Sequence, residues 1–288
     1  HWGNFFVKLP KIWTNKNTFK TKIILQYVCY CSLIMTKNIL VEIIPQLKDN
    51  YSYLVYSNVN KLGVVIDPAD AAPIIKFIKD NDIILSGILI THHHADHNSG
   101  VNDLLKFQST KIYSPDQNIN KTSTIIKEGD IIKFNFIEFE VIATSGHTLD
   151  HVVYFSKKNN LLFSGDTLFR FGCGRIFEGT YDEMKKSLNK IEKLDDSINV
   201  YCGHEYTIHN LKFLKSIFHN NKMLDKAEQN ILRQINETKS SMPFNLGSEK
   251  KLNPFLSLKS PTYKNFMKKN SFDNVEMFRY LRDLRNDY

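Results

Sequence analysis

The stretch THHHADH, residues 91–97, places four histidines and one aspartate within seven residues. Imidazole and carboxylate groups are the ligands that borderline metal ions such as Zn²⁺ and Fe²⁺ prefer. His92 and His94 lie two residues apart, so in an extended segment their side chains point the same way, whereas His93 points away. Asp96 and His97 follow where the chain is expected to turn into a helix. This spacing allows one loop to offer two ligands to one metal ion and two to a neighbouring ion.

One loop cannot complete two coordination spheres, so further ligands are expected at other strand ends. Three candidates follow apolar stretches, each directly after a glycine that allows close backbone approach: His147 in TSGHTLDH, Asp166 in FSGDTLF and His204 in YCGHEYT. A lone buried histidine is usually a structural residue, but four separate segments that each supply a ligand type favour a metal centre. His151 and His209 have no such support, and we interpret them as structural.

The elements that must position these residues alternate between short apolar runs and amphipathic helices. Helices are predicted at residues 71–82, 98–107 and 180–194, the last opened by a capping box of Thr180 and Glu183. Strands are predicted at residues 39–47, 51–57, 61–68, 84–92, 111–114, 131–135, 137–143, 151–156, 160–166 and 199–204. The candidate ligands lie where apolar strands end, which is where α/β folds place their chemistry.

The pattern changes after about residue 208. Residues 210–240 have helical periodicity without a strand signal, residues 242–262 contain three prolines and are predicted as a loop, and residues 272–287 are predicted as a final helix. We therefore expect a metal-binding α/β domain over 35–208 and a helical domain over 209–288.

The composition is that of an ordinary globular protein, with 42% hydrophobic and 24% charged residues in a chain of 288. No apolar run reaches the roughly 20 residues that span a bilayer, so no membrane insertion is expected. Five lysines and no acids lie in residues 1–34, so only three of the eight net positive charges belong to residues 35–288. This small net charge does not predict binding to nucleic acid.

Cys173 and Cys202 have no obvious general base beside them in the sequence, and we interpret both as packing residues.

Residues 1–34 are basic, free of acids and unlike the rest of the chain in composition. They fit either an extension upstream of a start at Met35 or a targeting leader, because such leaders are basic and poor in acids. We expect a cytoplasmic protein if translation starts at Met35, and a mitochondrial or plastid protein if residues 1–34 are a leader.

The motifs THxHxDH, GHT, SGDTLF and GHE, in this order, resemble the metallo-β-lactamase superfamily over about residues 38–206. The resemblance implies an α/β fold, the αββα sandwich, here with a C-terminal α-helical domain. It also implies two divalent metal ions per chain, for which we expect zinc, with iron or manganese as alternatives. One ion would take His92, His94 and His147, the other Asp96, His97 and His204, with Asp166 bridging both. A hydroxide shared by the ions would attack the substrate, and Asp96 and Asp166 would be the catalytic carboxylates.

Four downstream segments, GCGRIFEGT, YCGHEYT, NPF and RDLRND, resemble glyoxalase II, the hydroxyacylglutathione hydrolase family, over residues 36–288. That family hydrolyses S-D-lactoylglutathione, and other S-2-hydroxyacylglutathiones, to glutathione and D-lactate or the matching 2-hydroxy acid. The resemblance implies a glutathione thioester as the partner, with no nucleic acid or membrane, and we expect a monomer.

Glutathione carries two carboxylates, so its recognition requires fixed cations near the metals. Arg282 and Arg285 lie three residues apart and so share a face of the last helix. The resemblance assigns them to the glycine carboxylate, and Arg175 and Tyr206 to the peptide backbone and cysteine region. Phe177 occupies a position where the family usually has Tyr, and Arg175 and Arg285 stand where it usually has Lys, which keeps the charge but not the geometry.

Two other activities are alternatives. A persulfide dioxygenase of the same superfamily would hold a single iron and lack the basic pair on the last helix. A nucleic-acid hydrolase would be expected to carry more positive charge than residues 35–288 do. A non-catalytic role fits poorly, because every metal-ligand position is filled.

Overall fold

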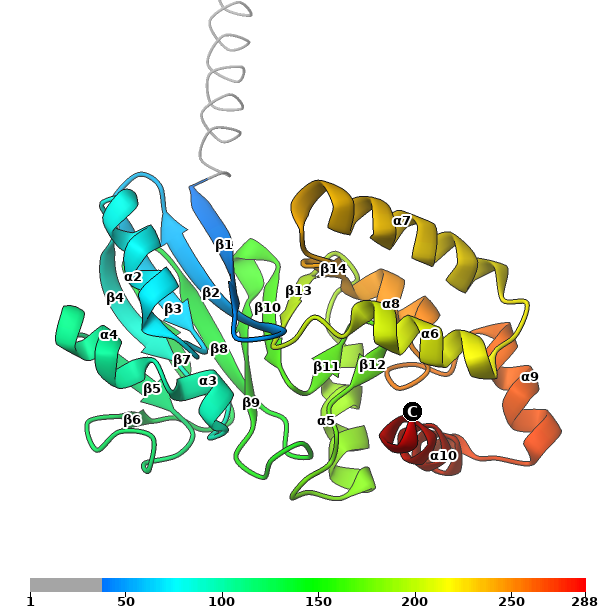
Figure 1. Cartoon of the computed structure of the whole chain (residues 1–288). Coiled ribbons are helices and arrows are strands. Elements are labelled where there is room, and N and C mark those ends of the chain that lie inside the picture. The colour runs from blue at the N-terminus through cyan, green and yellow to red at the C-terminus, as the bar shows by residue number, and fades with distance from the viewer. Residues whose placement is uncertain (1–37) are drawn as a thin grey trace, which may run out of the picture. The chain divides into compact units, whose positions relative to one another are not determined.

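The computed structural model describes residues 38–288, and Ile39–Tyr288 form one compact unit (Figure 1). The expectations for residues 1–34 lie outside the described residues.

The first of two six-stranded sheets is built from the N-terminal half of this unit. Its strands follow one another in chain order: β1 (Ile39–Gln46), β2 (Asn50–Ser57), β3 (Leu62–Ile66), β4 (Ile84–Leu89), β5 (Lys111–Ser114) and β6 (Thr124–Ile125). β1, β2 and β3 pair antiparallel, and β3 to β6 pair parallel. The carboxyl ends of β3 and β4 therefore meet at one edge, where Asp67 and the 91–97 loop emerge.

The second sheet has the order β14-β13-β10-β9-β8-β7. Its strands are β7 (Ile131–Lys133), β8 (Glu138–Ala143), β9 (Val152–Ser156), β10 (Leu161–Gly165), β13 (Asn199–Cys202) and β14 (Phe244–Asn245). Only β10 and β13 pair parallel, so their carboxyl ends deliver Asp166 and His204 side by side. A short 3₁₀ turn, Lys157–Asn159, links β9 to β10.

Helices cover the outer faces of the sheets, as the sandwich requires. The apolar sides of α2 (Ala71–Asp80) and α4 (Val101–Phe107) pack on the first sheet in one core cluster. The larger cluster joins the inner faces of both sheets with α5 (Tyr181–Glu192) and the C-terminal helices. The predicted αββα fold is confirmed, and so is the capping box of Thr180 and Glu183 that opens α5. Among the described residues, none of the helices combines the length and apolar character needed to span a bilayer.

The C-terminal part is helical, as predicted, but its middle differs from the prediction. Its helices are α6 (Thr207–Ile217), α7 (Lys222–Thr238), α8 (Leu246–Leu252), α9 (Pro261–Asn270) and α10 (Asn274–Asp287). The loop predicted at residues 242–262 is wrong, because this segment holds β14 and α8 and the start of α9. Asn245 caps α8 by accepting from the Ser248 N–H at 3.0 Å, and Pro261 opens α9.

Two short features near the candidate ligands were not predicted. The helix expected at 98–107 is preceded by a one-turn helix, α3 (Ala95–Asn98), which contains Asp96 and His97. A hairpin of β11 (Leu168–Phe169) and β12 (Gly172–Cys173) follows Asp166. Two-residue strands carry too little hydrophobic periodicity for a sequence pattern to reveal them.

Candidate metal centre and substrate cleft

All seven predicted ligands converge at the edge where the strands of the two sheets end. Their donor atoms form three overlapping groups whose members lie within 4.8 Å of one another. These groups are His92, His94 and His147; Asp96, His97 and His204; and His92, His97 and Asp166.

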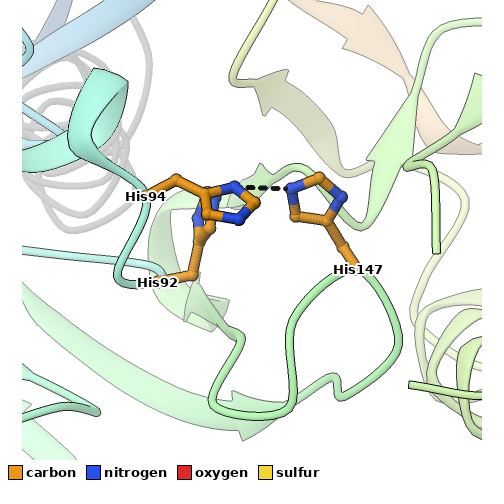
Figure 2. Close-up of side chains that lie close together, drawn as sticks. All are labelled: His92, His94 and His147. Carbon is orange, nitrogen blue, oxygen red and sulfur yellow. Dashed lines mark hydrogen bonds between the residues drawn. The ribbon is translucent and has the colours of Figure 1, made fainter. Parts of the chain in front are cut away.

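The first group consists of three imidazoles. Figure 2 shows His147 facing His94, with His94 Nδ1 and His147 Nε2 3.1 Å apart. His147 Nδ1 lies 2.7 Å from the Arg175 carbonyl oxygen, which can only accept, so the Nδ1 proton is held there and Nε2 is the unprotonated ring nitrogen. His92 Nδ1 contacts the Thr91 hydroxyl at 3.0 Å, so its Nε2 also points inward.

The second group is oriented by carboxylates behind it. His97 Nδ1 lies 3.0 Å from Asp67 Oδ2, and His204 Nδ1 lies 2.8 Å from Asp49 Oδ1. Histidines that bind metals commonly donate their other ring nitrogen to a carboxylate in this way, which fixes the ring and its tautomer. Both Nε2 atoms therefore face the centre.

Asp166 lies between the two groups. Its Oδ1 is 3.5 Å from His97 Nε2, and its Oδ2 is 3.4 Å from His147 Nε2 and 3.3 Å from His204 Nε2. It follows Gly165, whose φ of +46° is a left-handed conformation that favours glycine. A single buried carboxylate thus contacts ligands of both groups.

The donor set fits divalent metal ions. His92 Nε2, His97 Nε2 and Asp166 Oδ1 are buried and have no hydrogen-bond partner among residues 38–288. Burying three polar atoms without a partner at one place would destabilise the fold unless a further group binds them. Imidazole and carboxylate donors of this kind match zinc, iron or manganese.

The two groups differ in protonation. Burial lowers the pKa of each histidine in the first group, so these rings are neutral at pH 7. Burial also acts to lower the pKa of His97 and His204. The surrounding carboxylates, Asp166 first, outweigh it and raise those pKa values to about 10 and about 11. Asp166 and Asp96 have lowered pKa values and are ionised.

His93 and His151, which were predicted not to bind metal, lie outside the three groups. His93 points away from the centre and is held between Asp150 Oδ1 at 3.0 Å and Glu178 Oε1 at 3.2 Å. His151 is buried behind the site, where its Nε2 accepts the Asp166 N–H at 3.0 Å. His151 is therefore a structural residue that fixes the backbone of Asp166.

A cleft of about 570 Å³ opens over the metal centre. The five predicted substrate-binding residues all line it: Arg175, Phe177, Tyr206, Arg282 and Arg285. The Phe177 ring is 60% exposed and lies against His94 and His147, and the Tyr206 ring stacks on His204 at 4.8 Å. Arg285 Nε donates to Asn210 Oδ1 at 3.1 Å, which holds its guanidinium at the cleft wall.

Arg282 is placed differently from its helix neighbour. Its side chain is 4% exposed, and Nη1 donates to the Cys173 carbonyl at 2.7 Å and the Gly174 carbonyl at 3.4 Å. Part of its hydrogen-bonding capacity is therefore used within the protein. Cys173 itself is buried, consistent with a packing residue.

Several site residues were not predicted from the sequence. Asp67 ends an apolar strand, as Asp166 does, and could have been found by that signal. Asp49 lies in a segment that the sequence predicts as a simple turn, and Asn210 lies in a helix without distinguishing features. The Arg175 carbonyl is a backbone group and leaves no signal in the sequence.

Comparisons with known proteins agree with this geometry. A family model described as the metallo-beta-lactamase superfamily matches residues 47–204, and one described as the hydroxyacylglutathione hydrolase C-terminus matches residues 205–288.

Individual proteins are similar to this chain over most of its length. The hydroxyacylglutathione hydrolase of Bdellovibrio bacteriovorus is 36% identical over 263 residues, which cover 88% of this chain and 99% of that protein. That of Aliivibrio fischeri is 39% identical over 252 residues, covering 86% and 99%. The crystal structure of ETHE1 from Myxococcus xanthus shares the fold, with a TM-score of 0.59 at 20% identity, covering 86% of this chain and 100% of that one.

Proposed function

The chain belongs to the hydroxyacylglutathione hydrolase family of the metallo-β-lactamase superfamily, and from this we propose that it hydrolyses S-D-lactoylglutathione and other S-2-hydroxyacylglutathiones. The products are glutathione and the free 2-hydroxy acid. The observation that carries the proposal is the convergence of seven candidate metal ligands, five of which line a cleft whose wall carries Arg175, Arg282 and Arg285.

The metal ions would be held as the geometry suggests. His92, His94 and His147 would hold one ion and Asp96, His97 and His204 the other, with Asp166 shared; we propose zinc, with iron or manganese as alternatives. When bound, such a pair supplies hydroxide at neutral pH and polarises the thioester carbonyl. Asp96 Oδ2 accepts from Asn50 Nδ2 at 2.9 Å, which fixes the carboxylate that would orient the attacking group.

The substrate would lie across the cleft from its apolar rim to α10. Phe177 is largely exposed beside His94, where its ring can cover the acyl end and exclude water. Arg285 and Arg175 supply positive charge for the carboxylates of glutathione, and Arg285 is already oriented by Asn210. Because Arg282 Nη1 is bonded to the Cys173 carbonyl, we assign the main carboxylate contact to Arg285.

The direct test is a thioester assay paired with metal analysis. The full chain, loaded with Zn²⁺ or Fe²⁺, is expected to remove the thioester absorbance of S-D-lactoylglutathione and to hold two ions per chain. A chelator-treated sample should be inactive and recover when metal is restored. No turnover by the metal-loaded protein would contradict the proposal, and oxygen consumption with glutathione persulfide would indicate a dioxygenase instead.

Replacing Arg285 by Ala is expected to raise KM for S-D-lactoylglutathione about tenfold while kcat changes less than about twofold. A charge-assisted hydrogen bond far from the reacting carbonyl contributes equally to ground-state and transition-state binding, and about 1.4 kcal/mol corresponds to tenfold. The measurement is steady-state kinetics of the purified variant.

The matched control is Arg279→Ala on the same helix, where the arginine is half exposed and pairs with Asp182. It should leave KM unchanged. A fall in kcat with unchanged KM for Arg285→Ala would place Arg285 outside substrate binding.

A further inference from the structure

The hairpin of β11 and β12 is held by the C-terminal helical part along its whole length. Backbone groups of six consecutive residues, 169–174, bond to buried side chains from α6, α8 and α10 and from the residue that follows α8. The side chains are Asn210, Glu249, Asn253 and Arg282, and each is at most 4% exposed.

Asn253 makes the central contact. Its Nδ2 donates to the Phe169 carbonyl at 3.2 Å and to the Gly172 carbonyl at 3.0 Å, so one amide joins both strands of the hairpin. Its Oδ1 accepts the Phe255 N–H at 3.0 Å, which fixes the rotamer. Asn253 belongs to the NPF motif, yet it lies outside the lining of the substrate cleft described above.

Glu249 holds the tip of the same hairpin. Its Oε2 accepts the Phe171 N–H at 2.8 Å, and Phe171 has a φ of +60°, in the left-handed region that an aromatic residue rarely adopts. A tip in this conformation persists only when its surroundings enforce it. The buried carboxylate on one side and Asn253 on the other provide that enforcement.

The hairpin connects two parts of the metal centre. Asp166 lies two residues before β11, and Arg175, whose carbonyl orients His147, lies two residues after β12. The two ends are in close contact, because the Gly174 N–H donates to the Thr167 carbonyl at 3.2 Å. A Cβ on Gly174 would lie 1.9 Å from the Asp166 carbonyl oxygen. A shift of the hairpin would therefore move both the shared carboxylate and the support of His147.

We propose that Asn253 is a positioning residue for the metal centre, which acts through the hairpin to fix Asp166 and His147. The inference rests on the proposed metal-binding function. It gives the C-terminal helical part a second role beside substrate binding: its polar side chains set the geometry of ligands that belong to the sandwich.

The test is metal affinity rather than turnover. Asn253→Ala is expected to weaken Zn²⁺ binding about 10- to 100-fold, the range found when groups that support metal ligands are removed. The affinity is measured by competition with a chromophoric chelator, on protein shown by circular dichroism to be folded at the temperature used. Asn253 touches neither substrate nor ligand, so a purely structural role would lower the melting temperature and leave the affinity unchanged.

The matched control is Tyr263→Phe. The Tyr263 hydroxyl donates to the Leu252 carbonyl, so this variant also loses a buried hydrogen bond at the end of α8, but none to the hairpin. It should destabilise the fold without changing Zn²⁺ affinity. Equal affinities for wild type, Asn253→Ala and Tyr263→Phe would overturn the proposal.

If Asn253→Ala does not fold, Glu249→Met is the second variant, because it removes the acceptor of the Phe171 N–H together with the carboxylate beside Asn253 and Arg170. It should weaken Zn²⁺ binding, and unchanged affinity would overturn the proposal. If the wild-type chain binds two ions but does not cleave thioesters, the proposed hydrolase function is wrong. The role of Asn253 would still be decided by the Zn²⁺ affinities of the variants.

Discussion

Gly203→Ala is expected to abolish tight metal binding and to lower thioester hydrolysis more than about 1,000-fold, although it removes no ligand. A Cβ at this position would lie 2.3 Å from Asp166 Oδ1 and 2.7 Å from His97 Cε1, so the carboxylate and the ring would have to move apart. The backbone cannot retreat, because the Gly203 N–H donates to the Gly165 carbonyl and its own carbonyl accepts from Tyr51 N–H. Metal ions contribute several kcal/mol to such reactions, and each 1.4 kcal/mol is about tenfold in rate.

The measurement is the metal content of the dialysed variant together with kcat/KM. Gly87→Ala is the matched control, since its Cβ would lie 2.6 Å from Cε1 of the half-buried Phe134, which packs against the core away from the metal centre. It should lose stability but retain both ions. If Gly203→Ala retains two ions and wild-type activity, the placement of Asp166 between the two groups is wrong.

The ligand set could be predicted because its signals are local. His92, His94, Asp96 and His97 lie within six residues, and each remaining ligand directly follows a glycine at or shortly after the end of an apolar strand. Such a pattern needs no knowledge of how the strands pair. The assignment of ligands to a particular ion rests on resemblance and stays a prediction; two of the three groups of donor atoms have the same members as the two predicted sets.

The groups that orient the ligands could not be predicted in this way. Asp49 reaches His204 across 155 positions of sequence, and the Arg175 carbonyl reaches His147 from a segment with no ligand of its own. These contacts depend on the bridge between Asn50 and His204 and on the hairpin, both of which are tertiary features. Sequence periodicity reports which face of an element is buried, not which distant backbone group it meets.

Arg282 and Arg285 show that sequence spacing also fails to predict tertiary contacts within one helix. Their spacing correctly predicted a shared face, and both line the cleft. Yet Arg282 is nearly buried and bonded to the hairpin, whereas Arg285 is held by Asn210 and less buried. Helical spacing could not distinguish them, because the difference arises from the segment packed against α10.

The two metal ions are expected to respond very differently to pH. In protein without bound metal, Asp166 and the other nearby carboxylates raise the pKa of His97 to about 10 and that of His204 to about 11. Both rings therefore carry an additional proton, and a positive charge, at pH 6 to 8. A metal ion can bind only after these two protons leave. Affinity at the Asp96, His97 and His204 group should therefore rise with pH, by about 100-fold per unit when two protons are displaced.

The ion at His92, His94 and His147 provides the internal comparison. Burial lowers the pKa of all three rings, so they hold a proton less readily than His97 and His204 and release fewer protons when they bind metal. Stepwise Zn²⁺ titration of chelator-stripped protein at pH 6, 7 and 8 should show one ion retained at the lowest pH and the second gained as pH rises. Calorimetry in buffers of different ionisation enthalpy counts the protons released at each step. Equal pH dependence for both ions would mean that the carboxylates around Asp166 do not hold His97 and His204 protonated, and the division of the site into a neutral and a charged half would be wrong.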